Sequence, residues 1–386
     1  MNKIPTKKSG FNPNWQIKTL NEVCDKISAG GDKPDDCTTE KTEENQIPIF
    51  SNGIKNKGLC GYTKTPTITK PALTISARGT IGFACVRYEP FFPIVRLICV
   101  IPNEKLVVLE FLCYALQYII PQGEGTSVPQ LTIPNFKKIE IPIPPLDEQK
   151  RIASALSKID AYLENTIKLI EEKERFKRGI AKKLLTCKEG ENIPEARFKG
   201  FEDEWEETQI LEFVNNNIIK IEKGKSITKS KIEEGDIPVI AGGKTPPYYH
   251  NKYNYNFPCI TISASGSAGY VWFHDYKIWA SDCHVIYTDN KRYNIKFLYH
   301  YLKNIQDSIY YLQVGGVQKH VYSKDLIKLN IPNITIEEQE KIGGYLSLLD
   351  EEIDNLKKQK ELIKEMKRGA MQKLLSGEVR LVDNYD

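Results

Sequence analysis

The chain has 386 residues, more than the roughly 100 to 200 residues of an ordinary single core, so its length predicts two domains with connecting elements. An apolar content of 40% and a charged content of 27% are typical of a globular protein and exclude a disordered chain. The net charge of +4 is too small to identify a nucleic-acid partner by itself, although basic side chains outnumber acidic ones in the first domain.

The sequence shows no sign of a membrane protein or of disulfide bonds. No apolar run approaches the roughly 20 residues that span a bilayer, and the polar start, MNKIPTKKSG, lacks the apolar core of a signal peptide. The nine cysteines form no C-x-x-C pair and their number is odd, which indicates scattered, reduced and mostly buried thiols. We therefore expect a cytoplasmic location.

The first predicted domain covers residues 1–145. It is rich in Gly, Pro, Tyr and Ile, and its short apolar or alternating runs, such as PALTISA and RLICVIP, are separated by turn residues. This texture predicts short strands with few helices, of which the clearest is expected at residues 107–118.

The first spacer helix is predicted within residues 146–190. Residues 147–186 contain no proline, and the DEQ run in their first turn suits the positive end of a helix dipole. The apolar residues recur with alternating spacings of three and four, which indicates the seam of a coiled coil. The two heptad rows are Ile152, Ile159, Thr166 and Ile180, and Leu156, Leu163, Ile170 and Leu184.

The chain then repeats itself with a shift near 190 residues. GFNPNW ending at Trp15 matches GFEDEW ending at Trp205. LTISARGTIG from Leu73 matches ITISASGSAG from Ile260, where insertions in loops have changed the shift by a few residues. The chain therefore holds one structural unit written twice.

The second copy predicts the same parts as the first. Its domain covers residues 191–335, with the clearest helix at 294–306, and its spacer helix and tail cover residues 336–386. The long helix is expected at 337–375. Its heptad rows are Ile342, Leu349, Leu356, Ile363 and Ala370, and Leu346, Ile353 and Leu374.

Two such apolar stripes in one chain most simply pack on each other. Because a globular domain precedes each helix, an antiparallel pair gives a pseudo-twofold tandem repeat with a domain at either end. The expected fold class is α+β, with two mixed α/β domains separated by two long antiparallel coiled-coil helices.

Sequence motifs of catalysis and of metal or cofactor binding are missing. AGGKT at 241–245 is not a phosphate loop, because Pro238 stands where the motif needs Gly and no long helix follows. The five histidines, all in the second repeat, lack metal-binding spacings, and no G-x-S-x-G elbow is present. We therefore expect no catalytic residue, no metal site and no cofactor in this chain.

Three features of the repeat are specific enough to compare with a known family: IPIPPLDEQKRIASALSKID, GFEDEW after IPEARFK, and the duplicated KRG and KLL pattern. With these motifs the chain resembles, over essentially its whole length, the specificity subunit of a Type I restriction-modification system. It implies two target-recognition domains, each reading one half of a bipartite DNA target, and conserved helices that dock two methyltransferase subunits. It also implies restriction subunits that join this core, and it places the methyl donor and the catalytic motifs in the partners.

Polar, flexible or aromatic loops at corresponding places in the two repeats are the expected DNA contacts. Arg78 suits a bidentate contact with guanine, and the lysines suit phosphates. The predicted DNA-contacting residues are Ser51, Asn52, Lys55, Lys57, Ser76, Arg78, Thr80, Gln130, Lys244, Thr245, Tyr248, Tyr249, Ser263, Ser265, Gln318, Lys319 and His320. For each of them an ordinary structural role is the alternative. Four further residues are expected to serve backbone turns, namely Gly79, Gly82, Gly266 and Gly269.

Two other classes of function are weighed against DNA recognition. A structural coiled-coil adaptor with two protein-binding globular ends is the alternative, and the charge-neutral second domain does not discriminate against it. The basic first domain and the loops rich in Gly, Lys and Asn favour double-stranded DNA. A self-contained nuclease or methyltransferase is disfavoured by the missing motifs.

Overall fold

The computed structural model describes residues 11–120 and 131–382, which form two compact units. Unit 1 comprises residues 1–167 and 359–386, and unit 2 comprises residues 168–358. Both units contain part of each long helix, because these helices continue past the unit boundaries. The two helices are α4 (Leu146–Leu185) and α9 (Ile336–Ser376). The domain boundaries near residues 145, 190 and 335 remain a prediction.

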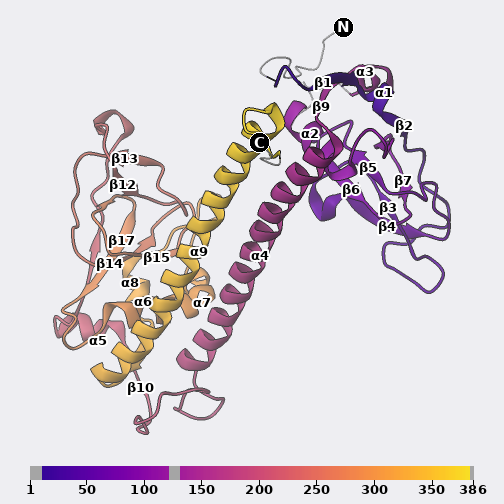
Figure 1. The fold of residues 1–386 in the computed structure, drawn as a ribbon. Helices are drawn as coiled ribbons and strands as arrows, with labels where there is room; N and C mark the ends of the chain where they lie inside the picture. The colour runs from indigo at the N-terminus through magenta and orange to yellow at the C-terminus, as the bar shows by residue number, and fades with distance from the viewer. Residues whose placement is uncertain (1–10, 121–130, 383–386) are drawn as a thin grey trace. The chain divides into compact units, whose positions relative to one another are not determined.

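Unit 1 contains three small sheets (Figure 1). The largest is antiparallel with the strand order β2-β8-β5-β6, the second has the order β4-β3-β7 with β3 and β7 parallel, and the third is the antiparallel pair β1-β9. The strands are β1 (Gln16–Thr19), β2 (Cys24–Ala29), β3 (Ile47–Phe50), β4 (Leu59–Thr63), β5 (Ala72–Ile75), β6 (Ala84–Arg87), β7 (Phe92–Pro93), β8 (Ile98–Pro102) and β9 (Glu140–Ile143). The shorter helices are α1 (Leu20–Val23), η1 (Lys55–Gly58), α2 (Leu109–Ile119) and α3 (Ile133–Lys137).

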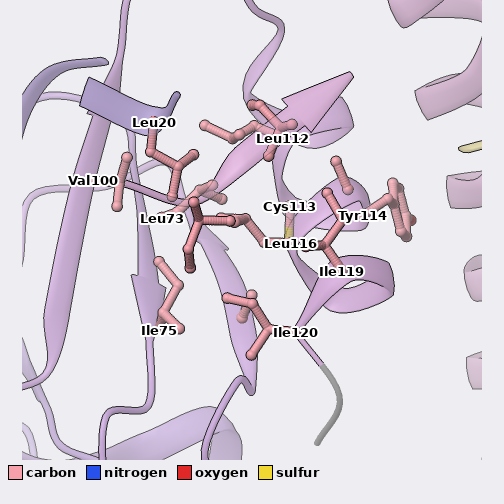
Figure 2. Packing of buried hydrophobic residues seen from close by; sticks show 14 of the residues in the cluster. Leu20, Leu73, Ile75, Val100, Leu112, Cys113, Tyr114, Leu116, Ile119 and Ile120 are labelled. Carbon is pink, nitrogen blue, oxygen red and sulfur yellow. The ribbon is translucent and has the colours of Figure 1, made fainter. Parts of the chain in front are cut away.

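The core of unit 1 lies between the four-stranded sheet and helix α2. Figure 2 shows Leu73 and Val100 from the sheet in one cluster with Leu112 and Leu116 from α2. A smaller cluster around Phe91 includes another residue of β5, whose four residues are all buried. A strand covered on both faces is mostly apolar and does not alternate, which fits the run ALTI of β5. Its one polar residue, Thr74, is buried and accepts a hydrogen bond from Arg87 at 3.1 Å.

Unit 2 repeats this architecture strand for strand. Its sheets have the orders β11-β17-β14-β15, β13-β12-β16 and β10-β18, with the same parallel and antiparallel pairings as in unit 1. The strands are β10 (Glu206–Gln209), β11 (Ile219–Lys223), β12 (Ile237–Ile240), β13 (Tyr248–His250), β14 (Cys259–Ser263), β15 (Val271–His274), β16 (Trp279–Ala280), β17 (Cys283–Thr288) and β18 (Asn330–Asn333). The shorter helices are α5 (Ile210–Asn215), η2 (Lys229–Lys231), α6 (Ile295–Asn304), α7 (Gln306–Tyr311) and α8 (Ser323–Leu326).

The predicted helices are confirmed with one correction. The long helices differ from their predicted bounds by a single residue at each end, and α2 lies where the first short helix was expected. The helix predicted at 294–306 is wrong at its end, because α6 stops at Asn304 and α7 begins at Gln306. Ile305 has φ −94° and ψ 23°, outside helical geometry, and no sequence signal marks that break.

The repeated Gln of the DEQ and EEQ motifs fixes the start of each long helix. Gln149 accepts a hydrogen bond from the backbone N–H of Val108 at 2.8 Å and donates to the carbonyl oxygen of Pro144 at 2.8 Å. Gln339 makes the equivalent bonds to Asn294 and Ile334, at 2.8 and 2.9 Å. The second helix therefore starts with the same geometry as the first, although it lacks the proline pair that precedes the first.

The repeated Glu of the same motifs forms a buried ion pair in each unit. The Glu148 carboxylate, 2% exposed, accepts two hydrogen bonds from Arg380 at 2.5 and 2.7 Å in unit 1. The Glu338 carboxylate is equally buried and accepts two from Arg197 at 2.8 and 2.9 Å in unit 2. Each arginine lies in the segment that follows the other long helix. Each ion pair therefore joins the first turn of one long helix to the segment after the other.

The parts of α4 and α9 within each unit pack antiparallel. In unit 1 Asp160 binds Lys367 at 2.6 Å, while Tyr162 contacts Gln359, so residue numbers fall along α9 as they rise along α4. Unit 2 repeats the pattern, because Lys173 binds Glu352 at 2.7 Å and Lys177, one turn later, binds Asp350. Most heptad residues are buried or half-buried, and ion pairs occupy the places where lysines interrupt the heptad rows. The predicted antiparallel pairing is confirmed within each unit.

Replacing Arg197 with methionine should destabilise unit 2, because Glu338 would keep a buried charge without its partner. Removing one member of a buried pair costs about 3 to 5 kcal/mol, so the midpoint of urea unfolding should fall clearly. Arg292→Met is the matched control, since the ion pair of Arg292 with Asp289 is mostly exposed and such pairs contribute about 0.2 to 1 kcal/mol. Equal midpoints for the two variants would show that the buried pair does not stabilise the unit.

Candidate nucleic-acid interface

Two of the segments selected from the sequence meet in unit 1, and we call residues 51–58 and 76–82 the first loop cluster. Asn52 accepts a hydrogen bond from the backbone N–H of Ala77 at 2.8 Å. Ser76 accepts one from the backbone N–H of Gly53 at 3.3 Å. The backbone of Leu131 donates to Ala77 at 3.2 Å, so the chain returns to this cluster directly after residues 121–130.

Three corresponding segments meet in unit 2, and we call residues 241–247, 263–269 and 313–321 the second loop cluster. The backbone of Ser267 donates to Gly242 at 2.6 Å, and that of Val321 donates to Ala264 at 3.0 Å. A Cβ atom on Gly242 would lie only 2.6 Å from the carbonyl oxygen of Ser265, so this close approach requires glycine. The bond of Val321 to Ala264 is equivalent to that of Leu131 to Ala77, so the described parts of the two clusters share this contact.

Four predicted contact residues use their side chains inside the clusters. Asn52 also donates to the carbonyl oxygen of Val95 at 2.7 Å, and Ser76 is buried. Ser263 is buried and donates to the carbonyl oxygen of Ala241 at 3.4 Å, while Ser265 is hydrogen-bonded to Asp282. These side chains shape the loops, which is the structural alternative considered for them.

The other predicted residues differ in exposure. The exposed ones are Lys55, Lys57, Arg78, Lys244, Thr245, Tyr248, Tyr249, Gln318 and Lys319. The half-buried ones are Ser51, Thr80 and His320. Lys57 forms an ion pair with Glu164 at 3.2 Å. The predicted residue Gln130 lies outside the described residues, as do the others from 121 to 130.

The four turn glycines behave as predicted. Each has a positive φ, between 63° and 86°, in which a side chain would be strained. These φ values belong to Gly79, Gly82, Gly266 and Gly269. The glycines therefore serve the backbone of the clusters.

Arg96 was not among the residues predicted to contact DNA. It lies in the connection between β7 and β8, next to the carbonyl oxygen that Asn52 holds, and its side chain is exposed. The φ angles of Val95 and Arg96 are +55° and +57°, so this connection has an unusual backbone. Unit 2 has only two residues between the equivalent strands, so comparison of the repeats could not have matched Arg96 to a partner.

The prediction also missed a basic segment beside the second loop cluster. Lys225, Lys229 and Lys231 follow β11 and are exposed, and the Lys229 ammonium lies 5.8 Å from the ring centroid of Tyr248. The segment after β2 in unit 1 is acidic, with the sequence GGDKPDDCTTEKTEEN. Comparison of charges between the repeats would have revealed this difference.

One loop of the second cluster presents an apolar side chain at its tip. The backbone N–H and carbonyl groups of Val314 and His320 bond each other at 2.8 Å, which closes the loop. Val317 is fully exposed between these ends and is followed by Gln318 and Lys319.

The histidines and cysteines have structural environments. Four histidines are buried, and burial lowers the pKa of His274 and His300 to about 3, so both are neutral at physiological pH. All nine cysteines are free, as predicted, but only four are buried and Cys60 is exposed, so the expectation of mostly buried thiols was wrong. Burial raises the pKa of the Cys113 thiol to about 12.

The described residues contain neither a metal-binding cluster nor a membrane-spanning helix. Between residues 11 and 120 and between 131 and 382, no group of three His, Cys, Asp or Glu side chains is placed to hold a metal ion. In the same part of the chain no helix has the length and apolar character needed to cross a membrane.

Comparison with known protein families identifies both repeats. The chain matches the family described as "Type I restriction modification DNA specificity domain" twice, over residues 12–172 and over residues 202–365. The two matches follow the internal repeat and together cover most of the chain.

Individual proteins give the same result. A Methanocaldococcus jannaschii protein described as the MjaX type I restriction enzyme specificity subunit is 30% identical over 309 residues, which are 74% of this chain and 72% of the relative. A Mycoplasma pneumoniae protein described as a type I specificity subunit is 37% identical over 153 residues, but the match spans only 45% of that relative. The crystal structure of the type I restriction-modification S subunit from M. genitalium shares the fold, with a TM-score of 0.69, 21% identity and coverage of 97% and 99% of the two chains.

Replacing Asn52 with alanine should loosen the first loop cluster, because two hydrogen bonds across it are lost. Each bond contributes about 1 kcal/mol, so hydrogen exchange at the Ala77 amide should become faster. Lys55→Ala is the control, since Lys55 belongs to the same loop and has an exposed side chain. Unchanged exchange in the Asn52 variant would mean that the two segments hold each other by other contacts.

Proposed function

The chain belongs to the type I restriction modification DNA specificity family, and from this premise we propose that its two loop clusters read the two halves of a bipartite DNA target. The convergence of loops from distant parts of each domain carries this proposal. Exposed polar and basic side chains surround each cluster, and duplex DNA is recognised by such groups at base edges and phosphates. Residues 1–145 and 191–335 are the proposed target-recognition domains.

The two halves of the target differ in this proposal, because the clusters present different side chains. The first cluster offers Arg78, with Arg96 beside it, and both suit guanine. The second offers the segment at Gln318, with Tyr248 and Tyr249 beside it, and these side chains suit adenine contacts and stacking. The two domains share a backbone fold but carry different side chains, so the two half-sites should differ in sequence.

The long helices are proposed to dock two methyltransferase subunits, with restriction subunits joining the assembly. Support comes from apolar side chains that both helices expose. Those of unit 1 are Tyr162, Leu362 and Met366, and those of unit 2 are Leu169, Phe176 and Leu348. Large exposed apolar residues are typical of surfaces that another protein covers. The chemistry of methylation and cleavage is proposed to belong to these partners.

The chain together with its methyltransferase partner should bind duplex DNA with strong salt dependence. Each neutralised phosphate contributes about −0.9 to the slope of log affinity against log salt concentration, and several lysines surround the clusters. Fluorescence anisotropy over a series of salt concentrations would measure this slope, and sequencing of methylated DNA would give the two half-sites. A complex that captures proteins but shows no salt-dependent DNA affinity would support the adaptor alternative.

Replacing Arg78 with alanine should weaken recognition of one half-site and leave the other unchanged. A bidentate contact with guanine is worth roughly 1 to 3 kcal/mol, so methylation at sites with the correct base should fall by about 5- to 150-fold. Arg78→Lys separates two roles, because lysine keeps a phosphate contact but lacks the planar fork that reads guanine. If the alanine variant instead loses methylation equally at all sites and the lysine variant restores it, Arg78 contacts a phosphate and does not read a base.

A further inference from the structure

In both units a side chain donates a hydrogen bond to the same backbone carbonyl group, but the side chain differs between the units. In unit 1 Gln117 of α2 donates a hydrogen bond to the carbonyl oxygen of Ala84 at 3.1 Å. In unit 2 Lys303 of α6 donates to the carbonyl oxygen of Val271 at 3.2 Å. Both acceptors are the first residues of equivalent strands, β6 and β15. A neutral amide in the first domain thus corresponds to an ammonium group in the second.

Two neighbouring positions change in the same direction. GFA at 82–84 corresponds to GYV at 269–271, so Phe83 is replaced by Tyr270. SNGI at 51–54 corresponds to AGGK at 241–244, so Ile54 is replaced by Lys244. The ammonium groups of Lys303 and Lys244 lie 4.2 and 5.6 Å from the ring centroid of Tyr270. Three positions are therefore neutral in unit 1, namely Ile54, Phe83 and Gln117, whereas the same positions in unit 2 place two ammonium groups around a tyrosine ring. We call this place in unit 2 the cationic corner.

The positive charge in this corner is only partly balanced. Burial, followed by the nearby charges of Lys177 and Lys244, lowers the pKa of Lys303 to about 8, and the carboxylate of Asp350 opposes this shift. Asp350 already pairs with Lys177. His300 packs beside both and is neutral, because burial holds its pKa at about 3. The corner therefore has spare positive charge, which favours an anion.

From these observations we infer that Lys244 contacts a phosphate of the DNA backbone in the second half-site, held in place by Tyr270 and Lys303. This inference rests on the proposed function. The ligand class is a phosphodiester, and Ile54, at the equivalent position of the first domain, cannot make this contact. The second half-site is therefore bound with more backbone contact than the first at this place.

Lys303 acts as a positioning residue. Its ammonium donates to the carbonyl oxygen of Val271 and to Gln306, the latter at 3.4 Å, and it faces the ring of Tyr270. Its hydrogens are thus used within the protein. Lys244 is exposed and its ammonium is available to a phosphate. Lys303 fixes the ring and adds charge beneath it.

This arrangement couples DNA binding to protonation of Lys303. A bound phosphate raises the pKa of Lys303 above its value of about 8 in the free protein, since an anion favours the charged form. Below that value both states are protonated and affinity is steady. As the pH rises through 8 the free protein loses the proton that the complex keeps, so affinity falls.

The test uses the full chain in complex with its methyltransferase partner and a duplex carrying the methylated target. The variants Lys244→Ile and Lys303→Gln introduce the residues that unit 1 has at these positions, where they fit the same backbone. Lys244→Ile should reduce the size of the salt slope by about 0.9, the contribution of one phosphate. Lys303→Gln should remove the decline in affinity between about pH 7 and pH 9 while keeping the fold.

Lys328→Ile is the control, because Lys328 is exposed in the same unit and pairs only with Asp325 among the contacts of the described residues. Its slope and pH profile should match the wild type. A wild-type slope in Lys244→Ile, or a pH decline that persists in Lys303→Gln, would overturn the inference and leave the proposed function intact. A wild-type complex without salt-dependent DNA binding would instead refute the proposed function itself.

Discussion

The buried carboxylates of Glu148 and Glu338 constrain the rest of the structure. A carboxylate removed from water is costly unless a charged partner and hydrogen bonds replace the lost hydration. Each one obtains both from a single arginine, which must therefore be delivered to the start of a long helix from the segment after the other helix. The neighbouring glutamines tie the same helix starts to the chain just before α2 and α6. Domain, helix and following segment are thereby fixed to one another within each unit.

This constraint explains why the two units share a backbone but not a surface. Some residues repeat closely because they fix the backbone. The glutamines of the Glu-Gln pairs bond to backbone groups, the glutamates form buried ion pairs, and the turn glycines adopt positive φ angles. The residues that differ, such as Ile54 and Lys244, lie on loops whose backbone is already determined. Side chains on these loops can be substituted with little loss of stability, because they contribute little to the core.

The sequence was sufficient for the features that depend on periodicity. Proline-free stretches with heptad spacing predicted both long helices to within one residue at each end, and the internal repeat predicted two matching domains. Contacts between distant segments were not accessible in this way. Nothing in the sequence indicates that Asn52 donates a hydrogen bond to the carbonyl oxygen of Val95, next to Arg96. Nor does it indicate that the ammonium groups of Lys303 and Lys244 both lie near the ring of Tyr270. The selected loops do converge, but Ser76 and Ser263 are buried supports, because a polar residue in a loop can serve the loop as readily as a ligand.

The division of the helices between the units affects the order in which the chain can fold during its synthesis. Unit 2 is complete once residue 358 has left the ribosome, whereas unit 1 needs residues 359–382, including Arg380, to cover Glu148 and the nearby core. Domains that emerge first usually fold first. Here the domain made first waits for the last helix, so its apolar surface stays open to chaperones or to misfolding for longer than that of the domain made second.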